Sequence, residues 1–557
     1  MIRKLLALSL LVLSCAPATQ QPPPQVVPPA PRFEATGTAK RVVLLSLDGL
    51  GADQLATQTN LPAFERLSRE GASARVLNVD PTLTGPTHVA ILTGADPQRT
   101  GIISNRFHLP GTPPDRMTRG MMVDPDAETL VEAARRQGKR VGVVSFPSVD
   151  NATARRTADF GLAWSEPLAE ARLVTLTRAN FKREWVPPTW SARPQRRVSY
   201  SPIMRARIEW GISRTIREDV DVVAYDTTND RTENYDLYLI EAAERELTTA
   251  TAAWFPISQW TGNGLHGSWS KILDAKPSLD VTLYWGAISR NDAWPASFRE
   301  LVDEHAGFWP GAPEEELPVS RQDFVDMSER FADYYTRAQT MTIARMPFDL
   351  LLLYQPQIDE AQHEFMGHPE AAPVIRAAFE AADRAVAAIG EALTPEDAFI
   401  VTGDHGLTVA NTQIRMNRLL AERGFAPRWR SYSSGAHSHL YRSGEPDDSD
   451  AVVRMLTGTG LFERVEKKTA AHHRNSGDVI ATSLPHVGLS NDDLEPSIAA
   501  PAPYGHHGAL NIHPAMHPPF YAVGTGVRPG AVGVIRQTQI ARFVAELLGI
   551  APPAAAE

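Results

Sequence analysis

Residues 41–49 read RVVLLSLDG, a short apolar run that ends on an acidic residue and a glycine. Such a run is typical of a parallel strand that is buried on both faces of a sheet. The run AFIVTG at 398–403 has the same character, and Asp404 and His405 follow it directly. Open α/β sheets build their sites beyond the carboxyl ends of their strands. The two runs therefore predict a buried sheet with Asp48, Asp404 and His405 at one edge.

Strand-like and helix-like runs alternate through residues 37–150, and the alternation returns in residues 346–410 and 488–557. It predicts an α/β fold in which a doubly wound, mostly parallel sheet is flanked by helices. Residues 151–345 break the pattern with strand-like runs and several tryptophans, which indicate a large inserted cap. Residues 411–487 read as a small α+β subdomain. We expect the core in three separate stretches, because 557 residues are too many for one hydrophobic core.

The first 36 residues read as an export signal and a tether rather than as part of the fold. Arg3 and Lys4 precede the apolar stretch LLALSLLVLS, which is too short to span a bilayer and has the layout of a secretory signal. Cys15, the only cysteine, follows the residues VLS in an arrangement that resembles a bacterial lipobox. The proline-rich stretch after it is typical of a semi-rigid tether. We expect an exported protein with a lipid anchor that faces the periplasm, with simple secretion as the alternative.

Acidic residues and histidines recur in the short contexts LLSLDG, TLTGPTH, IDEAQH, VTGDHG and GHHG. Asp359 and His363 stand four residues apart, so on a helix they share one face and can bind one ion. Thr84 precedes a helical pattern, where the helix dipole and a metal would both favour an alkoxide. Two divalent ions about 4 Å apart can hold the attacking and leaving oxygens of a displacement at phosphorus. The contexts thus predict one bimetallic site, formed by Asp48, Thr84, Asp359, His363, Asp404, His405 and His507.

Together these contexts resemble the alkaline phosphatase superfamily, and within it the nucleotide pyrophosphatase/phosphodiesterase family. The resemblance implies an alkaline phosphatase-like core and two divalent metal ions, which the ligand types identify as zinc. Manganese or iron in one site stays an alternative. One zinc would be held by Asp48, Asp404 and His405, with Thr84 as its fourth ligand and as the nucleophile.

The second zinc implied by the resemblance would be held by Asp359, His363 and His507. Asn105 stands in TGIISN, at the position where members of the family carry an asparagine that binds a nonbridging phosphoryl oxygen.

Several polar residues near these contexts are not expected to bind metal. Thr87 and Gln362 depart from the family pattern, which has asparagine and glycine there, and we expect both to affect packing rather than chemistry. His437 and His439 alternate in the strand-like run AHSHLYR, for which a structural or surface role is favoured over ligation. His506, beside the ligand His507, is expected to be an orienting or an exposed neighbour rather than a second ligand.

The resemblance implies a hydrolase of phosphodiester or pyrophosphate bonds that acts through a phosphothreonine-type intermediate on a small phosphate ester or nucleotide. The alternatives are a phosphomonoesterase of the same superfamily, a phosphonate hydrolase, and a lipoprotein binding module without turnover. A net charge of −10 argues against a nucleic-acid groove, which requires basic stripes. Membrane contact is expected only through the lipid anchor, and no pattern predicts an oligomeric state.

Overall fold

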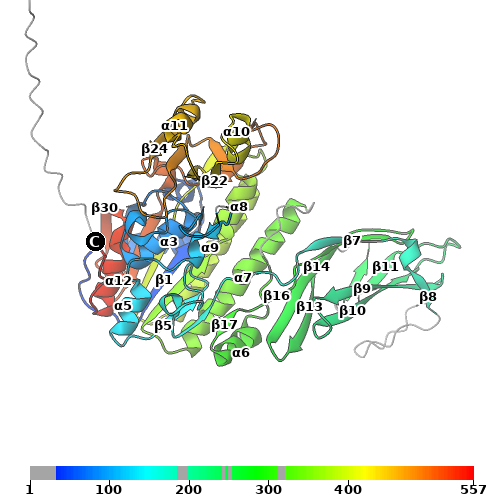
Figure 1. Cartoon of the computed structure of the whole chain (residues 1–557). Coiled ribbons are helices and arrows are strands. Elements are labelled where there is room, and N and C mark those ends of the chain that lie inside the picture. Colours follow the sequence, from blue (N-terminus) through cyan, green and yellow to red (C-terminus); the bar gives the residue numbers. More distant parts are fainter. Residues whose placement is uncertain (1–32, 114, 185–197, 241–244, 249–253, 312–319) are drawn as a thin grey trace, which may run out of the picture.

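The computed structural model describes residues 33–113, 115–184, 198–240, 245–248, 254–311 and 320–557 (Figure 1). The expected signal, the lipobox and most of the tether lie outside these residues. Among the helices of the described ranges, none is both long and apolar enough to cross a membrane.

A nine-stranded sheet forms the centre of the molecule, in the order β17-β6-β5-β18-β1-β19-β29-β2-β30 (Figure 1). The neighbours from β6 to β19 run parallel to one another, as do β2 and β30. Only β17 and β29 run antiparallel to their neighbours. The predicted mostly parallel sheet is therefore confirmed. Its strands are β17 (Ala293–Trp294), β6 (Phe160–Leu162), β5 (Val141–Val144), β18 (Leu350–Gln355), β1 (Val42–Leu47), β19 (Ala398–Gly403), β29 (Pro519–Gly524), β2 (Ala72–Leu77) and β30 (Gly530–Arg536).

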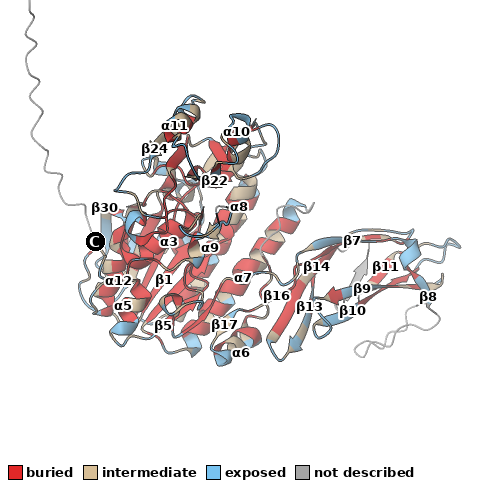
Figure 2. Ribbon diagram, in the orientation of Figure 1, coloured by how far each residue is buried: buried red, intermediate tan, exposed pale blue. Residues whose placement is uncertain are grey.

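Helices cover both faces of this sheet, and every residue of β1, β18 and β19 is buried (Figure 2). Alternate side chains of β1 enter opposite hydrophobic clusters, because successive side chains of a strand point to opposite faces. One cluster includes residues of α2 (Pro62–Glu70), α7 (Arg321–Arg345) and α9 (Ala372–Ala392). The other includes residues of α3 (Thr84–Thr93), α5 (Leu130–Arg136) and α12 (Ile540–Leu548).

A smaller sheet lies at the carboxyl edge of the large one, in the order β22-β23-β25-β24 (Figure 1). Its strands are β22 (Trp429–Ser434), β23 (His437–Arg442), β25 (Val479–Ser483) and β24 (Phe462–Lys467), which pack with α10 (Met416–Glu422) and α11 (Ser449–Thr457). A three-stranded sheet of β26 (Val487–Ser490), β21 (Thr412–Arg415) and β27 (Ile498–Ala499) joins it. We call these elements the small subdomain; they begin where the sequence predicts an α+β segment and extend about a dozen residues further.

Two further sheets, in the orders β12-β11-β10-β9-β8 and β13-β14-β15-β7, pack around one hydrophobic cluster. Figure 1 shows that these sheets extend sideways from the core, so residues 172–290 form an arm rather than a cap over the carboxyl edge. The strands of the arm are β7 (Arg172–Leu176), β8 (Lys182–Glu184), β9 (Ile203–Gly211), β10 (Arg217–Tyr225), β11 (Leu237–Ile240), β12 (Arg245–Thr248), β13 (Trp254–Thr261), β14 (Gly264–Lys276), β15 (Asp280–Trp285) and β16 (Ser289–Arg290), which pairs with β14.

The expected insertion of residues 151–345 is thus narrower than predicted. Its ends belong to the core, because β6 and β17 pair at the edge of the large sheet and α7 packs on α9. Short elements complete the core: α1 (Ala52–Ala56), α4 (Pro97–Thr100), β3 (Arg106–Phe107), β4 (Thr118–Arg119), α6 (Ala296–His305), α8 (Gln357–Phe365), β20 (Thr408–Ala410) and β28 (Tyr504–His506).

Candidate metal centre

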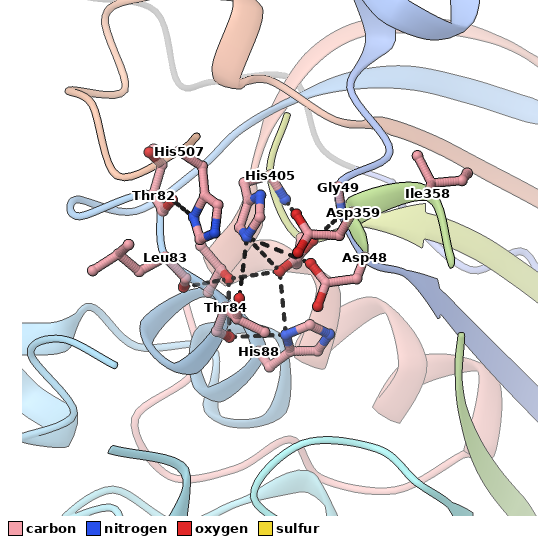
Figure 3. A network of polar contacts seen from close by, with 12 residues as sticks. Asp48, Gly49, Thr82, Leu83, Thr84, His88, Ile358, Asp359, His405 and His507 are labelled. Atoms are coloured by element: carbon pink, nitrogen blue, oxygen red, sulfur yellow. Dashed lines mark hydrogen bonds and ion pairs between the residues drawn. The ribbon is translucent and has the colours of Figure 1, made fainter. Parts of the chain in front are cut away.

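The predicted metal ligands meet at the carboxyl edge of the large sheet (Figure 3). Asp48 follows β1, and Asp404 with His405 follows β19, so the two central parallel strands deliver them side by side. Asp359 and His363 lie on α8, which follows the next strand, β18. His507 follows β28, and Thr84 is the first residue of α3. A chain of contacts links all seven residues predicted from the sequence.

Asp48, Asp404 and His405 form what we call the inner half of the cluster. The Nε2 atom of His405 lies 3.5 Å from Oδ1 of Asp48 and 3.1 Å from Oδ2 of Asp404. These side chains offer ligand atoms within 4.8 Å of one another, a spacing at which one metal ion could bind all of them. All three residues are fully buried.

The electrostatics of the inner half favour a cation. Burial and the neighbouring carboxylates of Asp404 and Asp359 raise the pKa of Asp48 well above its ordinary value. Burial, with the charge of Asp359, raises the pKa of Asp404 to about 7. The Oδ1 atoms of Asp48 and Asp359 are buried and accept no hydrogen bond from the described residues. Burying such groups unpaired is costly, so oxygen and nitrogen donors arranged in this way fit a divalent ion.

Asp359, His363 and His507 form the outer half. His363 donates from Nδ1 to the carbonyl of Gly505 at 2.8 Å, and His507 donates from Nδ1 to the carbonyl of Thr82 at 3.1 Å. A carbonyl can only accept, so each ring carries a proton on Nδ1 and directs Nε2 toward the cluster, where it could bind a metal ion. The Nε2 atom of His363 lies 3.2 Å from Oδ2 of Asp359, as their helical spacing predicts.

The outer half is more open, and it is linked to the inner half through His405. The side chain of His363 is 30% exposed. The ring of His405 stacks on that of His507, with centroids 3.7 Å apart, and both rings offer ligand atoms close to Asp359. Although burial opposes a charged ring, Asp359 raises the pKa of His363 to about 10. An ion in the outer half would therefore displace a proton from His363.

Thr84 lies at the N-terminus of α3, next to the inner half. The helix α3 begins at Thr84 itself, earlier than the expected helical run, since Pro86 is tolerated in the first turn. The Oγ1 atom of Thr84 lies 3.3 Å from Nε2 of His405, between the inner half and the helix N-terminus. The backbone N–H of Gly85 donates to Oδ1 of Asn105 at 2.7 Å. This bond holds the side chain of Asn105 against the first turn of α3.

Two supporting residues were not predicted from the sequence. The hydroxyl of Tyr354, in β18, donates to Oδ2 of Asp48. His88 donates from Nδ1 to the carbonyl of Thr84 at 2.8 Å and accepts from Ser46 at Nε2, at 2.9 Å. Burial lowers the pKa of His88 to about 4, so this ring is neutral. The sequence offered one signal for each of these two residues. Tyr354 stands near the end of an aliphatic strand, and His88 stands one helical turn after Thr84.

The two residues that depart from the family pattern make buried hydrogen bonds, and the hydroxyl of Thr87 also lies 3.5 Å from Oδ2 of Asp404. The hydroxyl of Thr87 donates to the carbonyl of Leu83 at 2.7 Å. The side-chain amide of Gln362 donates to the carbonyl of Gly49 at 2.9 Å, which ties α8 to the loop after β1.

Comparisons with known proteins agree with this geometry. The family described as Type I phosphodiesterase / nucleotide pyrophosphatase matches residues 42–510, a range that contains the whole cluster. Bis(5'-adenosyl)-triphosphatase enpp4 of Xenopus laevis is 27% identical over 172 residues, which cover 29% of this chain and only 34% of that protein.

Solved structures share the fold. Murine ectonucleotide pyrophosphatase / phosphodiesterase 5 matches with a TM-score of 0.51 and 15% identity, over 92% of this chain and 96% of that chain. A structure of an inactive variant of the murine protein contains AMP bound in a complex. Phosphonoacetate hydrolase of Sinorhizobium meliloti 1021 matches with a TM-score of 0.50 and 15% identity, over 93% of this chain and 98% of that chain.

Proposed function

Because the chain belongs to the type I phosphodiesterase/nucleotide pyrophosphatase family, we propose that it is a two-metal hydrolase of phosphodiester or pyrophosphate bonds with Thr84 as its nucleophile. The observation that carries the proposal is the hydroxyl of Thr84, which lies at a helix N-terminus and 3.3 Å from His405. A binding module would need the ligands but no nucleophile. The arrangement therefore favours turnover.

The donor set fits two ions, and its nitrogen and carboxylate ligands suit zinc. When bound, the ions would supply Lewis-acid stabilisation of the attacking and departing oxygens. The inner half and Thr84 would hold one ion, and the outer half would hold the other.

The protein's own residues account for the remaining steps. The Oγ1 atom of Thr84 attacks phosphorus in line, so that its bond to phosphorus forms while the bond from phosphorus to the leaving oxygen breaks. Water then replaces the Thr84 oxygen and regenerates the free hydroxyl. His88 fixes the Thr84 carbonyl and with it the first turn of α3. The amide NH2 of Asn105 donates to a nonbridging oxygen, where negative charge is concentrated.

We propose a nucleotide-containing diester or pyrophosphate as the substrate. The name of the frog relative describes a bis(5'-adenosyl)-triphosphatase, and the murine protein is seen with AMP. A diester carries one charge fewer than a monoester on the transferred group, so it needs less cationic help and more room for its second substituent.

A phosphonate hydrolase is the second candidate, because the phosphonoacetate hydrolase structure matches this chain with almost the same TM-score as the murine phosphodiesterase. The fold therefore does not separate the two chemistries.

Purified protein reconstituted with zinc tests these proposals. We expect a higher kcat/KM for the nitrophenyl ester of thymidine monophosphate than for nitrophenyl phosphate, and no phosphate release from phosphonoacetate. The reverse ranking of the two esters would assign a phosphomonoesterase, and preferential cleavage of phosphonoacetate would assign the phosphonate hydrolase. No turnover of any of them by the zinc-loaded protein would favour the binding module.

We propose that the protein acts outside the cytoplasm from a lipid anchor at Cys15. Replacement of Cys15 by Ser should move the protein from the membrane fraction to the soluble fraction of the envelope without a change in kcat. Unchanged fractionation of this variant would contradict the anchor.

A further inference from the structure

A buried pair of histidines in the small subdomain lies against the loop that carries Asn105. His437 and His439 alternate on β23, and their Nε2 atoms are 3.1 Å apart. Both residues are almost completely buried. The Nε2 atom of His439 is also 3.3 Å from the carbonyl oxygen of Ile103, two residues before Asn105. Among the described residues, neither histidine has a hydrogen bond or ring contact with a side chain of the metal cluster.

The hydrogen-bond partners determine where each proton is. The backbone N–H of Gly477 donates to Nδ1 of His439 at 3.2 Å, so this nitrogen carries no proton. Burial lowers the pKa of His439 to about 3, so its ring is neutral and its proton must be on Nε2. The Nε2–H group then points at the Ile103 carbonyl and at Nε2 of His437. The ring of His437 is also neutral. It accepts the hydrogen bond from His439 at Nε2 and donates from Nδ1 to the hydroxyl of Thr482 at 3.0 Å.

A second contact from the small subdomain holds the same loop. The side-chain amide of Asn475 donates to the carbonyl of Gly101 at 2.9 Å, and both partners are buried. Asn105 itself is fixed at two atoms, since Oδ1 accepts from Gly85 and its carbonyl oxygen accepts from the N–H of Gly120 at 2.8 Å. The carbonyl groups of Gly101 and Ile103 are therefore tied to the small subdomain, while the Asn105 side chain is tied to α3, the helix that begins at Thr84.

We propose that His439 is a positioning residue for catalysis, which acts through the Ile103 carbonyl to hold Asn105 beside Thr84. The inference rests on the proposed function, because it requires Asn105 to donate to the phosphoryl group. It assigns the small subdomain a role in the reaction. The hydrogen-bonded pair of His437 and His439 sets the position of the Asn105 amide, which stabilises a nonbridging phosphoryl oxygen. Because that amide acts mainly on the charge of the transition state, the loss of His439 should lower kcat and leave KM almost unchanged.

A double-mutant cycle separates this role from a structural one. The variants are His439→Phe, Asn105→Ala and the double variant, with zinc content and thermal unfolding measured for each. Phenylalanine fills the site of the ring without donating to Ile103. With the nitrophenyl ester of thymidine monophosphate as substrate, we expect Asn105→Ala to lower kcat about 100-fold and His439→Phe about 10-fold. In the Asn105→Ala background, His439→Phe should lower kcat less than about twofold, because the residue through which it acts is already gone.

Two further variants serve as matched controls. His439→Gln keeps an amide donor near the position of Nε2, so it should recover most of the lost kcat. His266, buried on β14 of the arm, is a histidine without a link to the site, and His266→Phe should leave kcat unchanged.

The outcomes distinguish the inference from the proposed function. An equal loss of kcat from His439→Phe in both backgrounds would overturn the positioning role, since a general weakening of the fold affects both alike. An unchanged kcat in Asn105→Ala would overturn the role of Asn105 in the proposed function, and the inference with it. A failure of His439→Gln to recover activity while it folds and binds zinc normally would also contradict the inference.

Discussion

The two halves of the metal cluster are built on different kinds of scaffold. The inner half stands at the ends of β1 and β19, two adjacent parallel strands in the middle of the sheet, and its side chains are fully buried. The outer half combines a helix, α8, with the loop after β28, and the side chain of His363 is 30% exposed. The hydroxyl of Thr84 contacts the inner half through His405. In the proposed reaction the more constrained part of the fold would thus hold the attacking group, and the more open part would face the departing one.

The largest effect on activity is expected for a variant that tests whether the inner half activates Thr84. Thr84→Ala should lower kcat/KM roughly 1,000-fold or more, a loss of about 4 kcal/mol in transition-state stabilisation. The zinc content should stay near that of the wild type, since three ligands remain in the inner half. Elemental analysis and steady-state kinetics measure both. Thr93→Ala, at the other end of α3, controls for damage to the helix and should keep its activity; near wild-type rates in Thr84→Ala would refute the covalent mechanism.

The second prediction tests whether the two halves, which differ in solvent exposure, release their metal ions at different rates. On addition of EDTA, we expect zinc to leave in two phases of equal amplitude, with the outer ion released at least about tenfold faster, because its ligand His363 is open to solvent. Elemental analysis of samples taken at timed intervals and desalted to remove the EDTA complex follows the zinc that stays bound. A single phase of release, or an enzyme that is fully active with one ion, would show that the halves do not behave as separate sites.

The third prediction concerns the support of the inner half. Tyr354→Phe removes the hydroxyl that donates to Asp48 and should weaken zinc binding about tenfold, the usual effect of losing a partner that orients a ligand. Competition with a fluorescent chelator gives the affinity. Tyr335→Phe is the matched control, because Tyr335 is also buried but its hydroxyl accepts from Trp309. Equal affinities in the two variants would mean that Tyr354 does not orient Asp48.

The smallest effect on activity is expected for the arm, which contributes no residue to either half. Lys271 on β14 pairs with Asp323 on α7, and both side chains are buried. Lys271→Met should lower the free energy of unfolding by about 3 kcal/mol, because Asp323 then keeps a buried charge without its partner. The kcat for a small diester should stay within about twofold, since the cluster is untouched. Lys276→Met, at an exposed position of the same strand, should change neither quantity.

The sequence predicted that most of these side chains would meet, because their placement follows from local rules. A strand that is buried on both faces must end at the edge of the sheet, so Asp48 and Asp404 could be placed from the apolar runs alone. The four-residue spacing of Asp359 and His363 likewise predicts that both side chains lie on one face of a helix. His507 could not be placed by spacing, and only the resemblance to a family brought it into the site.

Two of the features that were missed depend on contacts between distant segments. The hydroxyl of Tyr354 reaches Asp48 across more than 300 residues, and His439 reaches Ile103 across a similar separation. The hydrophobic periodicity of a sequence carries no information about such pairs. The insertion was predicted too wide for a related reason: β6 and β17 are two or three residues long and reveal their place only by pairing with the large sheet.

The distribution of the cluster along the chain has a consequence for folding. Its first ligand is Asp48 and its last is His507, which follows the small subdomain in the sequence. Loop closure over such separations costs entropy that is recovered only when the distant segments are already in contact. We therefore expect the complete cluster to form only once the large sheet has assembled around β1 and β19. Metal taken up during refolding would then mark a late step of assembly, and a chain that is cleaved before His507 would lack β29 and β30 of the sheet as well as the last ligand of the outer half.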